Sequence, residues 1–279
     1  MAICNIKDML KEAEKNKKAV GAFNVANIEM IRGVVGAAEN MNVPVILQFT
    51  GGWDKYIPID LIGTAMVSAA RKSKVDVAVH LDHGRDRNII EKAVEIGFSS
   101  VMFDGSALPY EENAEIVRSI ADSVKQKGVS VEAELGCVGG TEDGGKSSSI
   151  KYTDPELIEG FCSRSGADAL AIAIGNAHGN YTFEPKLNFR VLEQSHDKSP
   201  VPLVLHGGTG LTKESYQKCI RRGISKINIA TASFTAVMKN TRMMGYGEVK
   251  KDYFSMTEDV YEAVYKSTEE YIKMFNFID

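Results

Sequence analysis

Short apolar runs alternate with longer amphipathic segments along the whole chain. The runs are rich in valine, isoleucine and alanine, as strands buried in a parallel sheet are. Eight strands are predicted, at residues 19–24, 44–49, 76–82, 99–103, 129–134, 168–174, 201–206 and 224–229. Because the segments between them are long enough for helices, the pattern predicts a parallel sheet covered by helices.

The intervening segments show the spacing of helices. Apolar residues recur at intervals of three and four over residues 28–38, after Asn27 as a possible cap, and again over residues 110–124. Thr212 can cap a further helix that stops at Gly223, immediately before the last strand. These apolar stripes are interpreted as core contacts of helices that cover the strands.

Eight such units can close into a (β/α)8 (TIM) barrel. The chain has 279 residues, the usual size of one such barrel, and no linker interrupts the pattern. We therefore expect an α/β protein with a single domain over residues 1–279, ending in a helical segment at about residues 250–279. An open, doubly wound sheet would produce a similar pattern, and periodicity alone does not separate the two.

Composition narrows the class of protein. Hydrophobic residues make up 44% and charged residues 25%, and no stretch approaches the roughly 20 apolar residues of a membrane span. A net charge of −4 argues against nucleic acid as a partner, and the first residues do not form a signal peptide, so a cytoplasmic location is expected. The four cysteines show no paired spacing and are interpreted as small apolar residues.

Polar residues that can exchange protons or bind a metal gather at the carboxyl ends of predicted strands. Asp82 and His83 end the third strand, His206 ends the seventh, and His178 follows the sixth. Active sites of barrels lie at this end, and three converging imidazoles match a catalytic zinc site with an open fourth position. The alternative is that each histidine is a hydrogen-bonded core residue.

Two further histidines are not candidate ligands. His80 lies two residues before Asp82 and is expected to pack inside the barrel, whereas His196 is expected to be solvated. Lys226 lies near the amino end of the last strand, which is the wrong end for a Schiff base.

Two segments have the features of a phosphate site. The sequence HGGTG includes Gly207–Gly210, and NIAT covers Asn228–Thr231, where a strand ends and a helix begins. Glycines let backbone N–H groups approach phosphate oxygens, and a helix N-terminus adds donors and a favourable dipole. Barrels often bind phosphate between the loops after strands 7 and 8, so the two segments together predict an anion site.

Seven motifs in order carry a family resemblance. GAFNVANIE, HLDHG, SVMFDGS, VEAELGCVGGTEDG, GNAHGNY, LHGGTG and KINIAT, over about residues 19–233, resemble the motif series of class II fructose- and tagatose-bisphosphate aldolases. The resemblance implies that a ketose bisphosphate is cleaved to dihydroxyacetone phosphate and an aldehyde, with zinc as a Lewis acid.

The resemblance also implies roles for individual residues. His83, His178 and His206 would bind one zinc ion, Asp82 would exchange a proton with the C4 hydroxyl, and Glu142 would exchange one with the dihydroxyacetone phosphate carbon. Asp104 and Glu134 would be outer-shell groups or alternative ligands. Substrate contacts would come from Asn24, Thr50, Gly179, Gly207, Gly208, Thr209, Asn228, Ile229, Ala230 and Thr231, with a sodium or potassium ion bridging the C1 phosphate.

The pattern departs from the family after Thr231. The chain has no arginine after Arg242 to bind a distal phosphate, although Lys250 or Lys251 could substitute, and Trp53 stands where relatives have a small residue. The sequence therefore predicts that the aldehyde partner differs from glyceraldehyde 3-phosphate. A zinc hydrolase and a non-catalytic sugar-phosphate binder are the alternative functions, and the family suggests a homodimer or homotetramer.

Overall fold

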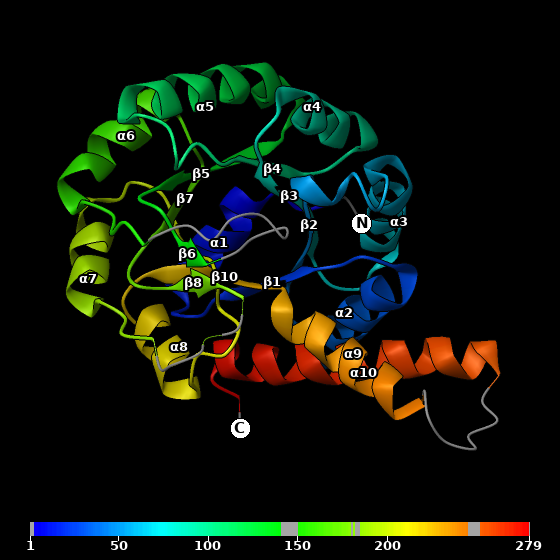
Figure 1. Ribbon diagram of the computed structural model, residues 1–279. Coiled ribbons are helices and arrows are strands. Elements are labelled where there is room, and N and C mark those ends of the chain that lie inside the picture. Colours follow the sequence, from blue (N-terminus) through cyan, green and yellow to red (C-terminus); the bar gives the residue numbers. More distant parts are fainter. Residues whose placement is uncertain (1–2, 141–149, 180, 182–184, 245–251, 279) are drawn as a thin grey trace.

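The structure is a computed structural model that describes residues 3–140, 150–179, 181, 185–244 and 252–278 (Figure 1). Eight parallel strands form a closed barrel in the order β1-β10-β9-β7-β5-β4-β3-β2. They are β1 Val20–Asn24, β2 Val45–Thr50, β3 Val77–Gly84, β4 Ser100–Phe103, β5 Ser130–Leu135, β7 Ala169–Ile172, β9 Leu203–Leu205 and β10 Ile224–Ile229. The barrel prediction is confirmed, and the open sheet is excluded, because β1 pairs with both β2 and β10.

Helices surround the barrel wall (Figure 1). They are α2 Ile28–Met41, α3 Ile59–Lys72, α4 Arg87–Ile96, α5 Tyr110–Val124, α6 Ile158–Ser165, α7 Phe189–Lys198 and α8 Lys213–Ile220, with short 3-10 turns η1 Gly51–Trp53, η2 Lys125–Lys127 and η3 Pro155–Leu157. The predicted caps are confirmed, since Asn27 accepts a hydrogen bond from the Met30 N–H and Thr212 accepts one from the Ser215 N–H.

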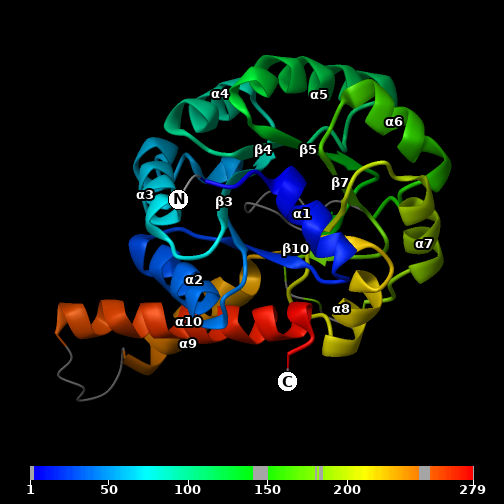
Figure 2. The ribbon, with the colours of Figure 1, turned by 180° about the vertical axis from the view of Figure 1, so that it is seen from behind.

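Helix α1, Ile6–Lys15, covers the amino-end mouth of the barrel (Figure 2). Its buried residues Ile6 and Leu10 pack against small or branched side chains from the lower barrel interior, among them Val20, Ala78 and Ala169. This apolar plug closes one mouth of the barrel, so polar chemistry is confined to the other mouth, where the strands end.

Two helices follow the last strand, one where the NIAT segment predicts a helix to begin and one within the helical segment predicted at about residues 250–279. Helix α9 covers Thr231–Met244 and helix α10 covers Tyr253–Asn276, and α10 packs along α2 (Figure 1). None of the described helices is long and apolar enough to cross a membrane.

A two-stranded ladder links the two glycine-rich loops at the carboxyl-end mouth. Strand β6, Gly139–Gly140, pairs in parallel with β8, Ala177–His178. Residues 141–149, including the predicted proton donor Glu142, lie outside the described part of the chain. The ladder fixes the position of His178 relative to the loop that precedes Glu142.

Candidate active site at the carboxyl ends of the strands

Strand β3 contains an irregularity at its functional end. Its pairing with β4 shifts between Leu81 and Gly84, so that β3 carries one extra residue opposite Val101–Phe103. Within this bulge His83 has a φ of 46°, a left-handed conformation that is uncommon outside glycine. Neighbouring residues of a regular strand face opposite sides, but here Asp82 and His83 both line the same pocket.

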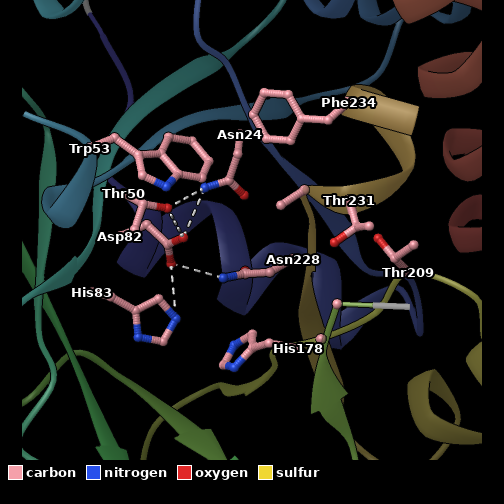
Figure 3. A pocket seen from close by; sticks show the side chains of 13 residues that line it. Asn24, Thr50, Trp53, Asp82, His83, His178, Thr209, Asn228, Thr231 and Phe234 are labelled. Carbon is pink, nitrogen blue, oxygen red and sulfur yellow. Dashed lines mark hydrogen bonds and ion pairs between the residues drawn. The ribbon is translucent and has the colours of Figure 1, made fainter. Parts of the chain in front are cut away.

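The Asp82 carboxylate is held by amide and hydroxyl donors from three other strands. Asn24 Nδ2 donates to Oδ2 at 2.9 Å, Thr50 Oγ1 to Oδ2 at 3.2 Å, and Asn228 Nδ2 to Oδ1 at 3.0 Å (Figure 3). Burial raises the pKa of Asp82, but the nearby positive charges of His83 and Lys226 and the hydrogen bond from Asn24 outweigh it and lower the pKa to about 2. Asp82 is therefore ionised, and able to accept a proton, at neutral pH.

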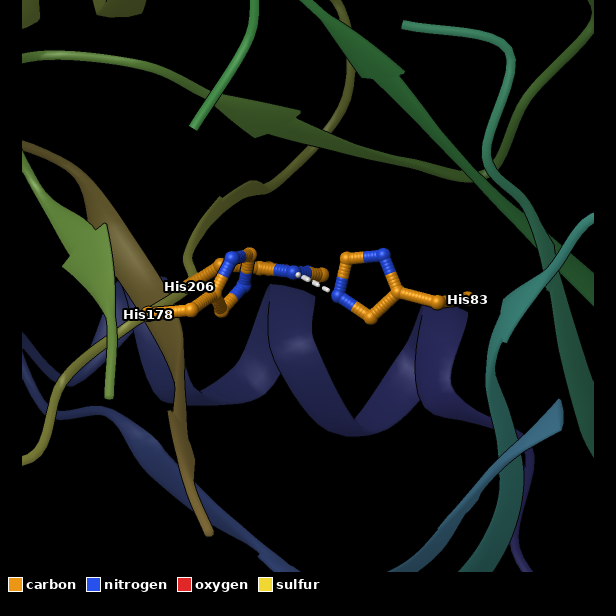
Figure 4. A group of neighbouring side chains, drawn as sticks. All are labelled: His83, His178 and His206. Carbon is orange, nitrogen blue, oxygen red and sulfur yellow. Dashed lines mark hydrogen bonds between the residues drawn. The ribbon is translucent and has the colours of Figure 1, made fainter. Parts of the chain in front are cut away.

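The three predicted histidine ligands lie together (Figure 4), and His83 Nε2 is 3.7 Å from Asp82 Oδ1. One ring nitrogen from each of His83, His178 and His206 falls within 4.8 Å of the other two. The ring centroids are 4.5 Å apart for His83 and His206 and 5.1 Å apart for His83 and His178. The sequence prediction that these three imidazoles share one place is confirmed.

Carboxylates behind two of the rings determine which nitrogen is available to a metal. His83 Nδ1 lies 3.1 Å from Asp104 Oδ2, and His206 Nε2 lies 2.9 Å from Glu132 Oε1. A carboxylate can only accept, so these nitrogens carry protons, and His83 Nε2 and His206 Nδ1 face each other at 2.7 Å. In the absence of a metal, a proton on His83 Nε2 can bridge the two nitrogens; a metal ion can take the place of that proton, so the donor set fits a metal ion.

The electrostatics of this cluster agree with that protonation. Burial, together with the positive charge of His83, lowers the pKa of His206 well below its ordinary value, so the ring is neutral. Burial works to raise the pKa of Asp104, but the hydrogen bond and charge of His83, with Ser106 and Arg85, hold it well below the usual range. Asp104 and Glu134 also form a second possible metal group with His83, in which each offers an atom within 4.8 Å of the others.

The predictions for His80, His196 and Lys226 can also be compared with the structure. His80 is fully buried inside the barrel, as predicted, and Lys226 is fully buried as well. The side chain of His196 is 41% exposed and its Nδ1 lies 3.5 Å from Glu14 Oε1, so it is only partly solvated.

The glycine loops form one wall of the pocket. Gly207 has a φ of 62°, and a Cβ built there would lie 2.2 Å from the Ala177 carbonyl oxygen, so only glycine fits. Helix α9 begins at Thr231, directly after β10, and Thr209 Oγ1 accepts a hydrogen bond from the Ala232 N–H. The loop and the helix N-terminus therefore meet, as the sequence predicts for an anion site.

Aromatic side chains form the opposite wall. Trp53 packs edge-on against Phe234, with ring centroids 5.2 Å apart, and against Phe49, with centroids 6.0 Å apart. In Figure 3, Trp53 lies on the Asp82 side of the pocket and Thr209 lies on the other. No lysine or arginine is among the described residues that line this pocket.

Most of the predicted substrate contacts line the pocket. Eight of the ten do so: Asn24, Thr50, Gly179, Gly207, Thr209, Asn228, Ala230 and Thr231. Gly208 and Ile229 are not among the lining residues, and the Ile229 side chain is fully buried in the core. Lys250 and Lys251, the candidate distal cations, lie outside the described residues.

Some residues of the site were not found from the sequence. Phe234 follows the last motif on α9, and Gln48 Nε2 donates to Asn24 Oδ1 at 2.6 Å from inside the barrel. Glu132 precedes Glu134 by two residues, and because alternate residues of a strand share a face, this spacing was a usable signal for it.

The fold and the site together define a (β/α)8-barrel enzyme with its reacting groups at the carboxyl ends of the strands. The family model described as fructose-bisphosphate aldolase class-II matches residues 4–279. The chain is 42% identical over 245 residues to a fructose-bisphosphate aldolase of Geobacillus stearothermophilus, covering 87% of this chain and 85% of that one. It is 39% identical to a fructose-bisphosphate aldolase of Staphylococcus aureus, with 87% and 86% covered.

A solved structure extends the likeness to three dimensions. The YdjI aldolase from Escherichia coli K12 matches with a TM-score of 0.88 and 37% identity, covering 98% of this chain and 97% of that one. The chain belongs to the class II fructose-bisphosphate aldolase family. It is therefore a lyase of carbohydrate metabolism that acts on a phosphorylated sugar, and this confirms the prediction of an aldolase over a hydrolase or a non-catalytic binder.

Proposed function

We propose that this protein is a zinc-dependent aldolase that reversibly cleaves a ketose 1-phosphate. Fructose and tagatose 1,6-bisphosphate belong to this class of substrate, but a ketose that releases an aldehyde other than glyceraldehyde 3-phosphate is the preferred one. The products are dihydroxyacetone phosphate and an aldehyde. The observation that carries the proposal is the convergence of three imidazoles beside an ionised, buried Asp82. Family membership supports the reaction class, and the site chemistry supports the choice of metal.

The metal would be held by His83 Nε2, His206 Nδ1 and one ring nitrogen of His178. When bound, zinc supplies Lewis acidity toward the ketose carbonyl. Asp104 fixes the proton of His83 on Nδ1 and so keeps Nε2 available.

Asp82 is the proposed general base for cleavage. It takes the proton of the C4 hydroxyl as the C3–C4 bond breaks, the oxygen becomes the aldehyde carbonyl, and the bond's electron pair passes to the ketose half. Glu142 is the proposed donor of the proton that C3 then receives. Asn228 supports binding near C4, since its Oδ1 has no hydrogen-bond partner in the described part of the protein and can accept from a substrate hydroxyl.

The C1 phosphate is proposed to lie on the opposite side of the pocket, against Gly179, Gly207, Thr209 and the start of α9 at Thr231. A sodium or potassium ion is proposed to bridge this phosphate. This side of the pocket offers the phosphate backbone amides and a helix N-terminus. Because no lysine or arginine is among the described lining residues, such a counter-ion would balance the phosphate charge.

The aldehyde half is proposed to extend past Asp82 toward the aromatic wall of Trp53 and Phe234. Aromatic faces bind apolar and C–H surface and offer a phosphate dianion nothing to pair with. We therefore propose an aldehyde partner other than glyceraldehyde 3-phosphate.

Relative kcat/KM values check this choice of aldehyde. Condensation with dihydroxyacetone phosphate should favour uncharged aldehydes over glyceraldehyde 3-phosphate, and Trp53→Ser should narrow that preference. Turnover of fructose and tagatose bisphosphates with ordinary and similar efficiency would contradict it.

We further propose that residues 1–279 act as one domain, in a cytoplasmic homodimer or homotetramer. Exposed apolar side chains on the C-terminal helices support assembly, including Met238 on α9 and Tyr253 and Phe254 on α10. Light scattering after size-exclusion chromatography measures the mass, and a monomer at micromolar concentration would contradict the assembly.

A coupled assay of triose-phosphate release tests the central proposal. Activity with a ketose bisphosphate should disappear when a chelator removes the metal and return when zinc is added. Activity that survives complete metal removal, or that returns with magnesium and not with zinc, would refute the zinc assignment.

A further inference from the structure

A fully buried ion pair lies inside the barrel beneath the histidine cluster. Lys226 Nζ on β10 is 2.8 Å from Glu132 Oε2 on β5, and neither side chain has any exposed surface. Their paired neighbours in the sheet are apolar, Ala169 beside Glu132 and Val20 and Val204 beside Lys226. The proposed cleavage uses neither residue.

Stability alone is a poor reason for this pair. Moving both charges out of water costs free energy that their attraction repays only in part, and apolar pairs of similar volume are often as stable or more so. The position of the second carboxylate oxygen offers another reason. Glu132 Oε1 lies 2.9 Å from His206 Nε2, so the same carboxylate joins the lysine to a candidate metal ligand.

The hydrogen bond between His206 Nε2 and Glu132 determines which ring nitrogen of His206 is free to bind a metal. Because Glu132 is paired with Lys226 and accepts the Nε2 proton, the lone pair of His206 is left on Nδ1, which faces His83 Nε2 at 2.7 Å. Without that acceptor the proton could move to Nδ1, and the ring could turn away from the cluster.

The third neighbour of Glu132 does not compete for this role. His80 Nε2 lies 3.8 Å from Glu132 Oε2, beyond hydrogen-bond distance, while His80 Nδ1 is 2.8 Å from Ser100 Oγ. The lysine and the metal-facing histidine are therefore the two hydrogen-bonded partners of this carboxylate in the described part of the protein.

We propose that Glu132 and Lys226 form a positioning pair for the metal site. Glu132 holds His206 in the tautomer and orientation that present Nδ1, and Lys226, through its hydrogen bond to Oε2, holds the Glu132 carboxylate in place inside the barrel. The inference rests on the proposed zinc site and deepens it, because the site then extends one layer down into the barrel.

Two variants, one that removes the charge of Glu132 and one that removes the charges of both Glu132 and Lys226, distinguish a positioning role from a purely structural one. Glu132→Gln should weaken zinc binding about 10- to 100-fold, measured by competition with a chromophoric chelator. The double variant Glu132→Leu with Lys226→Met removes both buried charges, so the metal-free protein should unfold at the same denaturant concentration as the wild type or a higher one. Its zinc affinity should nevertheless stay about 10- to 100-fold weaker.

The control removes a hydrogen bond at the same depth that does not reach His206. Ser100→Ala should leave the zinc dissociation constant within about threefold of wild type. A double variant that binds zinc as tightly as the wild type would overturn the positioning role, whereas a wild type that takes up no zinc would overturn the proposed function and this inference together.

Nitrogen NMR of the histidine rings tests the wild-type protein directly, without relying on a variant that folds. In chelator-treated protein the His206 ring, identified by the signal that His206→Gln removes, should carry its proton on Nε2. A proton on Nδ1 would overturn the proposal.

Discussion

Asp82 and His83 show how one extra residue in a strand can change which side chains reach the active site. Regular alternation would place one of them in the pocket and the other in the barrel wall. The extra residue in β3 and the positive φ at His83 bring both into the pocket. A proposed base and a proposed metal ligand therefore come from consecutive positions.

Asp82→Asn should remove the proposed base and keep its shape. We expect kcat for cleavage to fall about 10²- to 10⁴-fold, because an amide cannot accept the C4 hydroxyl proton. Zinc content, measured by mass spectrometry of metals, should stay at the wild-type level. Asp76→Asn, near the exposed amino end of the same strand, serves as the control and should keep full activity. An Asp82→Asn enzyme with near-normal kcat would assign the base elsewhere.

The buried cysteines should be inert, as their interpretation as small apolar residues implies. Burial raises the pKa of both the Cys162 and Cys219 thiols to about 12, so almost no thiolate exists at pH 8. Alkylation with iodoacetamide followed by peptide mass spectrometry should leave both unmodified in the native protein and modify both in denaturant. Rapid native modification of either would show that its environment opens to solvent.

At the scale of elements, the sequence predicts where strands lie better than how they are joined. All eight barrel strands were predicted because each contains a short run rich in valine, isoleucine, leucine or alanine, but closure depends on the pairing of β1 with β10, which no local pattern encodes. The bulge at His83 and the ladder of β6 and β8 were missed for the same reason. The histidine cluster was predicted because strand ends converge, whereas Glu132 and Phe234 reach the site through side-chain packing.

The contact between α2 and α10 depends on a glycine. A Cβ at Gly33 would lie 3.0 Å from the Tyr261 carbonyl oxygen and from the Tyr265 nitrogen, both backbone atoms of α10 that cannot move aside alone. Gly33→Leu should therefore lower the free energy of unfolding by about 1–3 kcal/mol, measured by urea denaturation. It should also speed proteolytic cleavage within α10.

Gly160→Ala is the matched control for that prediction. Gly160 is an exposed glycine of helix α6, with only the Tyr110 hydroxyl near a built Cβ. This substitution should raise the free energy of unfolding by about 0.4–1 kcal/mol, since alanine restricts the unfolded chain. If Gly33→Leu were equally harmless, α10 would have to be loosely attached.

At the scale of the whole molecule, the barrel separates support from chemistry. Helix α1 and its apolar plug close the amino-end mouth, and the charged layer of Glu132 and Lys226 lies between that plug and the pocket. The folded protein stabilises the ionised forms of Asp82 and Asp104 in the site. The free energy of unfolding therefore depends on pH.

The low pKa of Asp104 predicts the direction of that dependence. A carboxyl whose pKa is lower in the folded state contributes stability above its unfolded pKa of about 4, and loses it as pH falls toward the folded value. In the metal-free protein, urea denaturation between pH 4 and 3 should show the wild type losing up to about 1.4 kcal/mol per pH unit more than Asp104→Asn. Parallel curves for the two proteins would contradict the prediction.

The extra residue in β3 has a consequence for how this enzyme can fail. A single peptide bond joins Asp82, proposed to move the proton, and His83, proposed to hold the cation. A backbone movement that shifts one of them therefore shifts the other as well. Heat, pressure or a distant substitution that straightens this short stretch should abolish proton transfer and cation uptake at the same midpoint.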